Sequence, residues 1–206
     1  MAARLLKRGL AWWLVLLAGA VAPGCVGTVV QQSFPALDSA RAPIQRIAVA
    51  PLGVRPEAAV GAAPVVARYL VDAFAARGFE VVPPEEVARV SGALPAAAGL
   101  HELAATLKRE FGADAVLVGT ITRWVEREGG AAGSQRPASV GLLVDLYGAP
   151  DAHRLWRGDF DRTQQAGLEN VLLTPRYPGG GARWLSAEEF AQFGASELAA
   201  ALPLVP

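Results

Sequence analysis

The stretch AVLVGTIT, residues 115–122, gives the strongest strand signal in the chain and decides the fold. Its first four residues are all apolar, which is typical of a strand buried on both faces. From Gly119 onward the residues alternate in character, with Ile121 expected on one face and Trp124 on the other. The stretch therefore predicts a strand that begins in the centre of a sheet and ends with one face in water.

Two further strands follow after short links. Residues 139–147 alternate between apolar and other residues, and residues 153–163 form the third member of the set. Four side chains of the middle strand are expected on one face: Val140, Leu142, Val144 and Leu146. Because the links are short, the three strands are predicted to form an antiparallel meander.

The segment before residue 115 alternates between short apolar runs and stretches of helical periodicity. Two strands are predicted there, at residues 46–52 and 79–82, and three helices, at residues 64–77, 85–90 and 100–111. Gly112 is expected to end the third of these helices in the left-handed conformation. After the meander, Ser186 and Glu189 fit a capping box and predict a last helix over residues 186–202.

The order of these elements predicts an α/β fold of the α+β kind. Early crossovers build the parallel part of a single mixed sheet, the meander builds its antiparallel part, and helices pack on it. Three connections are expected to be irregular, at residues 53–63, 128–137 and 164–183. These connections are rich in glycine, proline or small residues.

The first 24 residues have the features of a secretory signal peptide. Three basic residues precede an apolar run at residues 10–21, and small residues precede Cys25, the only cysteine in the chain. The run is shorter than the ~20 residues that a spanning helix needs. A cysteine directly after small residues resembles the lipobox of bacterial lipoproteins, although Ala22 and Pro23 stand where Leu and Ala or Ser are usual.

The lipobox resemblance implies cleavage before Cys25, a diacylglycerol on its sulfur and an acyl chain such as palmitate on its new amine. The chain is then expected to have three parts: a signal peptide at 1–24, a mobile lipidated tether at 25–43 and a periplasmic α/β domain at 44–206. Within the tether, an edge strand at residues 28–30 is the alternative. In enterobacterial lipoproteins, an Asp directly after the cysteine keeps the protein at the inner membrane. This chain has Val26 at that position, so the analogy favours the outer membrane.

Charge and composition exclude several classes of partner. Three of the 19 basic residues lie in the signal peptide, which leaves 16 basic against 19 acidic residues in the mature chain. Nucleic acid is therefore not expected as a partner, because its phosphates need a basic surface. With Cys25 acylated, no thiol remains for a disulfide or a metal site. We expect no cofactor apart from the covalent lipid, and a fold that depends on its apolar core.

Catalytic patterns are weak in this sequence. The two histidines, His101 and His153, fall at a helix start and at a turn and are expected at the solvated surface. Asp159 and Asp161 share a strand face and form a possible acid–base pair, with a solvated strand face as the alternative. The run of three glycines at residues 179–181 lacks the Lys-Ser/Thr of a phosphate-binding loop and predicts a turn.

The tryptophans are the candidate contact residues. If Trp124 and Trp156 project from one face of the sheet, they could form an apolar patch flanked by arginines, because aromatic residues and arginine are enriched at contact surfaces. The candidate binding residues are Trp124, Trp156, Arg157 and Trp184, with Arg123 and Arg183 flanking them. The alternative is that the helix over residues 186–202 covers the indoles as ordinary core.

Three motifs resemble one group of bacterial envelope lipoproteins. RIAVAPL at residues 46–52 resembles their opening strand R-I-A-V-L-P-F, GADAVLVGTIT at 112–122 resembles G-A-D-A-V-L-x-G-x-V-T, and residues 140–146 with Leu155 and Trp156 resemble V-x-L-x-L-x-D followed by L-W. The group includes the curli-secretion channel lipoprotein and the lipoprotein that activates a penicillin-binding protein. The resemblance implies a domain that binds other envelope proteins or cell-wall machinery. A curli-type pore is not expected, because the links between strands are too short for added membrane strands.

Three functional hypotheses follow from these observations. The first is a membrane-anchored lipoprotein whose non-catalytic periplasmic domain binds proteins in cell-envelope assembly or maintenance. The second is a subunit of a secretion or surface-assembly complex. The third is an enzyme that hydrolyses the cell wall, for which Glu80, Asp114 and Asp159 are the candidate carboxylates.

Overall fold

The computed structural model of the protein describes residues 29–33, 43–95, 97–165, 177–204 and 206. The strands are β1 (Gln31–Ser33), β2 (Arg46–Val49), β3 (Gly53–Val54), β4 (Glu80–Val82), β5 (Ala115–Val125), β6 (Glu128–Gly129), β7 (Ser134–Arg136), β8 (Ser139–Gly148) and β9 (Arg154–Thr163). The helices are η1 (Glu57–Ala62), α2 (Ala63–Ala75), α3 (Pro84–Ala93), α4 (Leu100–Phe111), η3 (Pro178–Gly181) and α5 (Ala187–Ala201).

The main sheet is mixed, as the sequence predicts. Its strands follow the order β1-β9-β8-β5-β2-β4, and β3 also pairs with β5. β2 runs parallel to β4 and to β5, whereas β5, β8, β9 and β1 are successively antiparallel. The predicted meander of β5, β8 and β9 is therefore confirmed, and β5 joins the parallel and antiparallel halves of the sheet.

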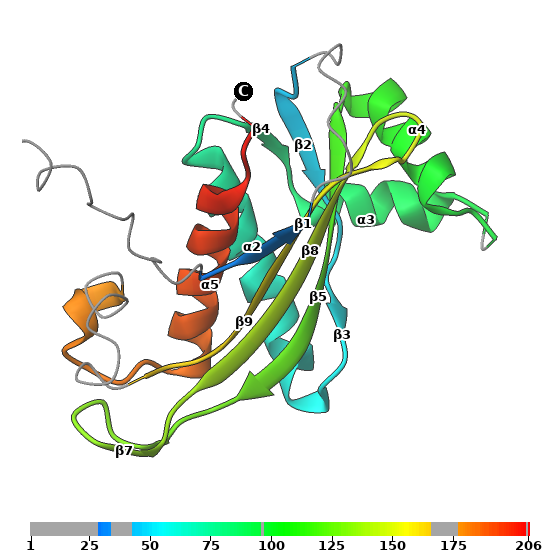
Figure 1. Ribbon diagram of the computed structural model, residues 1–206. Coiled ribbons are helices and arrows are strands. Elements are labelled where there is room, and N and C mark those ends of the chain that lie inside the picture. Colours follow the sequence, from blue (N-terminus) through cyan, green and yellow to red (C-terminus); the bar gives the residue numbers. More distant parts are fainter. Residues whose placement is uncertain (1–28, 34–42, 96, 166–176, 205) are drawn as a thin grey trace, which may run out of the picture.

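Helices cover the sheet on both sides, as Figure 1 shows. On one side α5 contacts β8 and β9, and α2 packs beside α5 and contacts β2 and β4. This side buries the larger core, which includes Phe74, Leu146 and Phe160. On the other side α3 and α4 cover β2, β4 and the beginning of β5 with a smaller core around Val87 and Leu107. Beyond α3 and α4, the strands of the meander continue.

The local signals for the helices explain their ends. Gly112 has φ 68°, the left-handed conformation predicted for it, and its amide bonds the carbonyl oxygens of the last turn of α4. Ser186 and Glu189 form the predicted capping box at the start of α5. At the other end of α5, the Arg77 guanidinium donates to the carbonyl oxygens of Ala199, Leu202 and Leu204.

Strand β5 departs from strict alternation because it contains a bulge. Ile121 lies opposite Leu142 of β8. Arg123, two residues further on, lies opposite Gly141, the neighbour of Leu142, so β5 has one extra residue there. The bulge turns Trp124 to the same face as Ile121. The prediction that Trp124 and Ile121 face opposite sides was therefore wrong, because one extra residue inverts the alternation that follows it.

Three segments predicted as tether or loop contain regular structure. The connection at residues 53–63 contains β3 and η1, and the connection at 128–137 contains the hairpin of β6 and β7. Residues 29–33 belong to the domain rather than to a mobile tether: Val29 and Val30 are each 5 % exposed, and Gln31–Ser33 pair with β9. The edge strand considered as the alternative therefore exists, displaced from residues 28–30 to Gln31–Ser33. The signal peptide and Cys25 lie outside the described residues.

Candidate binding surface

One side of the meander remains accessible, and we call it the open face. It is the side of β5, β8 and β9 opposite α5, beyond the part that α3 and α4 cover. Most of its side chains are half-buried or exposed. The register of the strands places these residues on it: Thr120, Thr122, Arg123, Gly141, Leu143, Asp145, Tyr147, Arg154, Arg157, Asp159 and Asp161.

The best-buried charge of the open face is Asp145. Asp145 is 8 % exposed and lies directly opposite Arg157 of the neighbouring strand β9. The guanidinium of Arg157 donates from Nε and from a terminal nitrogen to the two carboxylate oxygens, each at 2.7 Å. Arg154 approaches the same carboxylate at 3.9 Å. Two parallel charge-assisted hydrogen bonds fix the orientation of both side chains, so this part of the face is preorganised.

A second ion pair crosses the whole width of the meander. Arg123 of β5, Gly141 of β8 and Asp161 of β9 lie in one line across the three strands. Arg123 reaches Asp161 at 2.6 Å over the glycine. A Cβ atom at position 141 would overlap Thr122 Oγ1 and lie 3.1 Å from Arg123 Cβ. Gly141 therefore admits both the bulge and the ion pair.

A small polar hollow lies at the β1 side of the open face. Gln31, Asp159, Asp161 and Arg162 line it, and its volume is about 160 Å³. Burial, and then the nearby charge of Asp161, raise the pKa of the Asp159 carboxyl. The two aspartates share a face as the sequence predicts, since they lie opposite Leu143 and Gly141 of β8. Asp161 is engaged by Arg123, so the two carboxylates have different surroundings.

The predicted apolar patch of Trp124 and Trp156 is not present on the surface. Both indoles lie on the side of the sheet that α5 covers, and Trp156 is 1 % exposed. Its indole N–H donates to the side-chain oxygen of Gln32 at 3.2 Å, so it ties β1 to the core. Trp124 is half-buried and packs against the same core. The prediction that Trp156 is a surface contact residue was therefore wrong. The helix over residues 186–202 covers its indole, which was the alternative.

The other two candidate contact residues lie apart from each other. Arg157 lies on the open face, whereas Trp184 precedes α5 and is half-buried. The backbone of Trp184 is fixed by the segment around the β6–β7 hairpin, since its amide donates to Ala131 and its carbonyl accepts from Arg127. The four candidate residues therefore do not form one surface. Whether Trp124, Arg157 or Trp184 binds a partner stays a prediction.

Two of the candidate catalytic carboxylates hold the sheet together. Asp114 accepts the backbone amides of Gln45 and Arg46, each at 3.0 Å, and Lys108 at 2.8 Å. Burial would raise the pKa of the Asp114 carboxyl, but these hydrogen bonds outweigh it and hold the pKa below its usual value. Glu80 accepts from Arg46 Nε at 2.8 Å across the parallel pair of β2 and β4.

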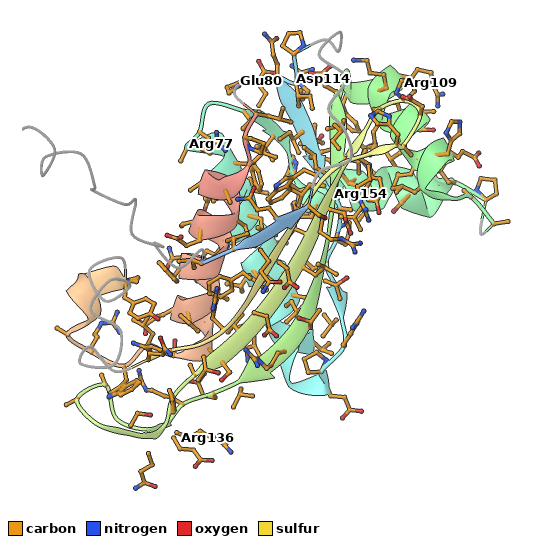
Figure 2. The ribbon with its side chains drawn as sticks, viewed as in Figure 1. Arg77, Glu80, Arg109, Asp114, Arg136 and Arg154 are labelled. Carbon is orange, nitrogen blue, oxygen red and sulfur yellow. The ribbon has the colours of Figure 1, made fainter. Side chains whose placement is uncertain are left out.

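These two carboxylates are also distant from the hairpin. Figure 2 shows Glu80 and Asp114 at one end of the molecule and Arg136 at the opposite end. The two histidines do not join them into a site: His101 is exposed on α4, and His153 is half-buried at the turn before β9 with Nδ1 3.1 Å from Asp151. Within the described ranges, no group of three or more His, Cys, Asp or Glu is placed to hold a metal ion.

Sequence reasoning missed Asp145 as a member of this surface. The alternation of residues 139–147 puts Asp145 on the side away from the core, which is a usable signal. Its partner Arg157 becomes apparent only from the register of β8 against β9, which includes an irregularity after Leu146. In the part of the chain that the structure covers, none of the helices is long and apolar enough to cross a membrane.

Comparison with known proteins gives structural likeness only. No protein-family model matches the chain, and no curated protein matches it. Among solved structures, it is similar to the PelC dodecamer from Paraburkholderia phytofirmans, with 20 % identity over 69 % of this chain and 87 % of that one and a TM-score of 0.44. It is also similar to lipoprotein GNA1162 from Neisseria meningitidis, with 23 % identity over 63 % and 92 % of the two chains and a TM-score of 0.43.

A third similar structure is the LpoB C-terminal domain from Salmonella enterica, with 18 % identity over 61 % and 87 % of the two chains and a TM-score of 0.42. One of the three, GNA1162, is a lipoprotein by name. Likeness of this degree carries no inference about function. The resemblance of the sequence motifs to the curli-secretion channel lipoprotein stays a prediction.

Proposed function

We propose that the protein is a lipid-anchored, non-catalytic binding domain of the bacterial cell envelope. The observation that carries the proposal is the junction between its N-terminal signal and its sheet. Strand β1 begins six residues after Cys25 and is already paired with β9. The cysteine that directly follows the signal peptide is thus only a few residues from a folded domain, as expected if this cysteine is the mature N-terminus and carries lipid.

The anchor explains the location that we propose. The signal peptide takes the chain across the inner membrane, and several acyl chains on Cys25 hold it to a bilayer, since each buried methylene contributes ~0.8 kcal/mol. Val26 after the cysteine favours the outer membrane, with the domain facing the periplasm. The partners that we propose are other envelope proteins or the cell-wall machinery.

A binding role is supported by the way the carboxylates are used. Asp114 and Glu80 stabilise the sheet, and the polar side chains of the open face pair with one another across strands. The open face therefore offers a preorganised set of arginine and aspartate side chains for contact with another protein, and arginine is enriched in contact surfaces. The hydrolase alternative depends on Asp159 alone among the three candidates.

The anchor is tested by growing cells with a fatty-acid analogue. Label should enter the wild-type protein and be absent from Cys25→Ser, with the signal peptide retained in that variant because cleavage depends on prior lipid transfer. Label that persists in Cys25→Ser would contradict the anchor. The hydrolase alternative is tested with the purified protein: cell-wall hydrolysis that is lost in Asp159→Asn would contradict the non-catalytic role.

The binding surface is tested by photo-crosslinking in intact cells. A photoreactive phenylalanine replaces Tyr147, which is half-buried on the open face. The matched control replaces Tyr69, which is also half-buried but lies on α2, on the opposite side of the sheet. Adducts with an envelope protein at position 147 and not at 69 are expected. Adducts at position 69 alone would contradict the open face as the contact surface.

A further inference from the structure

The chain between the proposed anchor and the folded domain is very short. Four residue steps separate Cys25 from Val29, so their Cα atoms can be no more than about 14 Å apart in any conformation. Val29 and Val30 are buried and belong to the larger core. The part of the domain surface around Val29 must therefore stay close to whatever Cys25 is attached to.

The start of β1 is fixed to the body of the domain by several contacts. Arg162 Nε donates to the carbonyl oxygen of Val29 at 3.1 Å. Gln31 lies opposite Asp159 in β9, and Gln32 receives the hydrogen bond from Trp156. Since a buried indole, a guanidinium and the strand pairing all hold this segment, it does not act as a hinge that could lengthen the tether.

The surface around Val29 is an edge of the sheet. β1 is the edge strand of the sheet and pairs only with β9 among the described strands, and its three residues are exposed to solvent. The chain direction of β1 places Val29 toward the C-terminal half of β9, where Asp161 and Arg162 lie. We call this part of the surface, made by residues 29–33 and 159–163, the anchor edge.

The chemistry of the anchor edge suits the polar layer of a bilayer. Gln31, Asp159, Asp161 and Arg162 line its hollow, and both signs of charge are present. The one large apolar side chain that is exposed among the described residues is Val60, which lies on η1 beside β3 and β5. The anchor edge can therefore lie against lipid headgroups without inserting apolar side chains into the hydrocarbon.

We propose that the anchor edge faces the headgroup layer of the membrane that holds Cys25. The domain would then have a fixed orientation relative to the membrane instead of rotating freely on a flexible tether. This inference rests on the proposed lipid anchor. It also predicts which end of the domain lies furthest from the membrane. β5 begins directly after α4, and its first residues pair with the end of β8 that is furthest from the anchor edge. Helices α3 and α4 then point into the periplasm, as the arrangement in Figure 1 implies.

The orientation is measured on the acylated full-length mature protein in phosphatidylethanolamine and phosphatidylcholine vesicles. The chain has a single cysteine, which the lipid occupies, so one engineered cysteine can carry a fluorophore. The probe is placed at the anchor edge in Gln31→Cys and, as the matched control, on α4 in Glu102→Cys; both residues are exposed. A nitroxide on the lipid headgroup quenches only fluorophores that it can approach closely.

Strong quenching is expected for the probe at position 31 and little for the probe at position 102. Inserting twelve Gly/Ser residues after Val26 adds a root-mean-square reach of about 20 Å and should reduce quenching at position 31 to that of the control. Circular dichroism verifies that both labelled variants are folded.

Equal quenching at the two positions, or quenching at position 31 that the insertion leaves unchanged, would overturn the inference. A protein that carries no lipid and does not float with the vesicles would instead contradict the proposed anchor, so the two failures are distinguishable. Quenching at position 31 that an added envelope protein abolishes while the lipid remains would assign the anchor edge to that protein and overturn the inference as well.

Discussion

The two faces of the antiparallel half of the sheet are made by alternate residues of the same three strands. On the covered face, Trp156 and Phe160 of β9 are buried under α5, whose Phe190 and Phe193 lie at edge-to-face distances of 5.4 and 5.9 Å from Phe160. On the open face, Arg157 and Asp161 of the same strand form ion pairs with Asp145 and Arg123. Neighbouring residues of one strand therefore belong to a tightly packed core and to a solvated set of charges.

The difference shows how much each face contributes to the stability of the domain. Burial of apolar side chains is the main favourable contribution to folding, because apolar area removed from water is worth about 25 cal/mol per Å². Ion pairs between partly exposed side chains contribute little, typically below ~1 kcal/mol. The exposed ion pairs of the open face, such as Arg123 with Asp161, can therefore change at low cost in stability, whereas the covered face cannot.

The largest effect is expected from truncating Phe160. Phe160→Ala should lower the free energy of unfolding by ~3–5 kcal/mol, because it empties a site that the rings of Phe190 and Phe193 and the backbone of Gly194 line. Asp161→Ala, one residue further along the strand, is the matched control and should cost ~1 kcal/mol or less. Urea denaturation measures both, and similar losses for the two variants would contradict the contrast between the faces.

A smaller effect is expected at Gly141, which lies opposite the bulge in β5. The bulge determines which residues at the end of β5 lie on each face. Gly141→Ala should destabilise the domain by ~1–3 kcal/mol, since the new methyl group overlaps Thr122 and crowds Arg123. Gly133→Ala is the control, because a Cβ atom there meets no atom within 4 Å. Thermal unfolding compares the two, and a Gly141→Ala variant as stable as the control would show that the bulge relaxes freely.

The smallest effect is expected from pH at the capping box of α5, the helix that covers the buried face. The hydrogen bond from Arg183, and then the amide of Ser186, lower the pKa of Glu189 to about 2 from 4.5. A depressed pKa in the folded state means that this contribution to stability is complete above pH 4.5 and is lost as the pH falls toward 2. The side chain is 38 % exposed, so water weakens the effect.

The measurement is the free energy of unfolding of wild type and Glu189→Gln between pH 2 and 6. The wild type should lose more stability than the variant over the range from pH 4.5 to 2, and the two slopes should agree above pH 5. Parallel curves over the whole range would contradict the pKa assigned to Glu189.

Local signals predicted the elements that depend on neighbouring residues in the chain. Gly112 ends α4 and Ser186 begins α5, because each depends on contacts within a few residues. The sequence also placed Val140 and Leu146 on one buried face, since period-two alternation holds throughout β8.

What depends on pairing between distant residues could not be predicted in this way. The bulge in β5 inverts the alternation at Trp124, and only the position of Gly141 in the partner strand offers a trace of it. The strand at Gln31–Ser33 has no periodicity of its own and exists because β9 and the indole of Trp156 offer it partners. The Trp patch was wrong for the same reason, since the cover over Trp156 comes from a helix that begins thirty-one residues later.

The clamp that Arg77 forms on the end of α5 has a practical consequence for protein engineering. The Arg77 guanidinium donates hydrogen bonds to the carbonyl oxygens of Ala199, Leu202 and Leu204. These bonds connect residues 199–204 to the end of α2. An affinity tag or fluorescent fusion at this end should therefore leave every residue up to Leu204 in place. Removing the residues from Leu202 onward would delete two of the three carbonyl oxygens that Arg77 binds and so weaken the link between α5 and the end of α2.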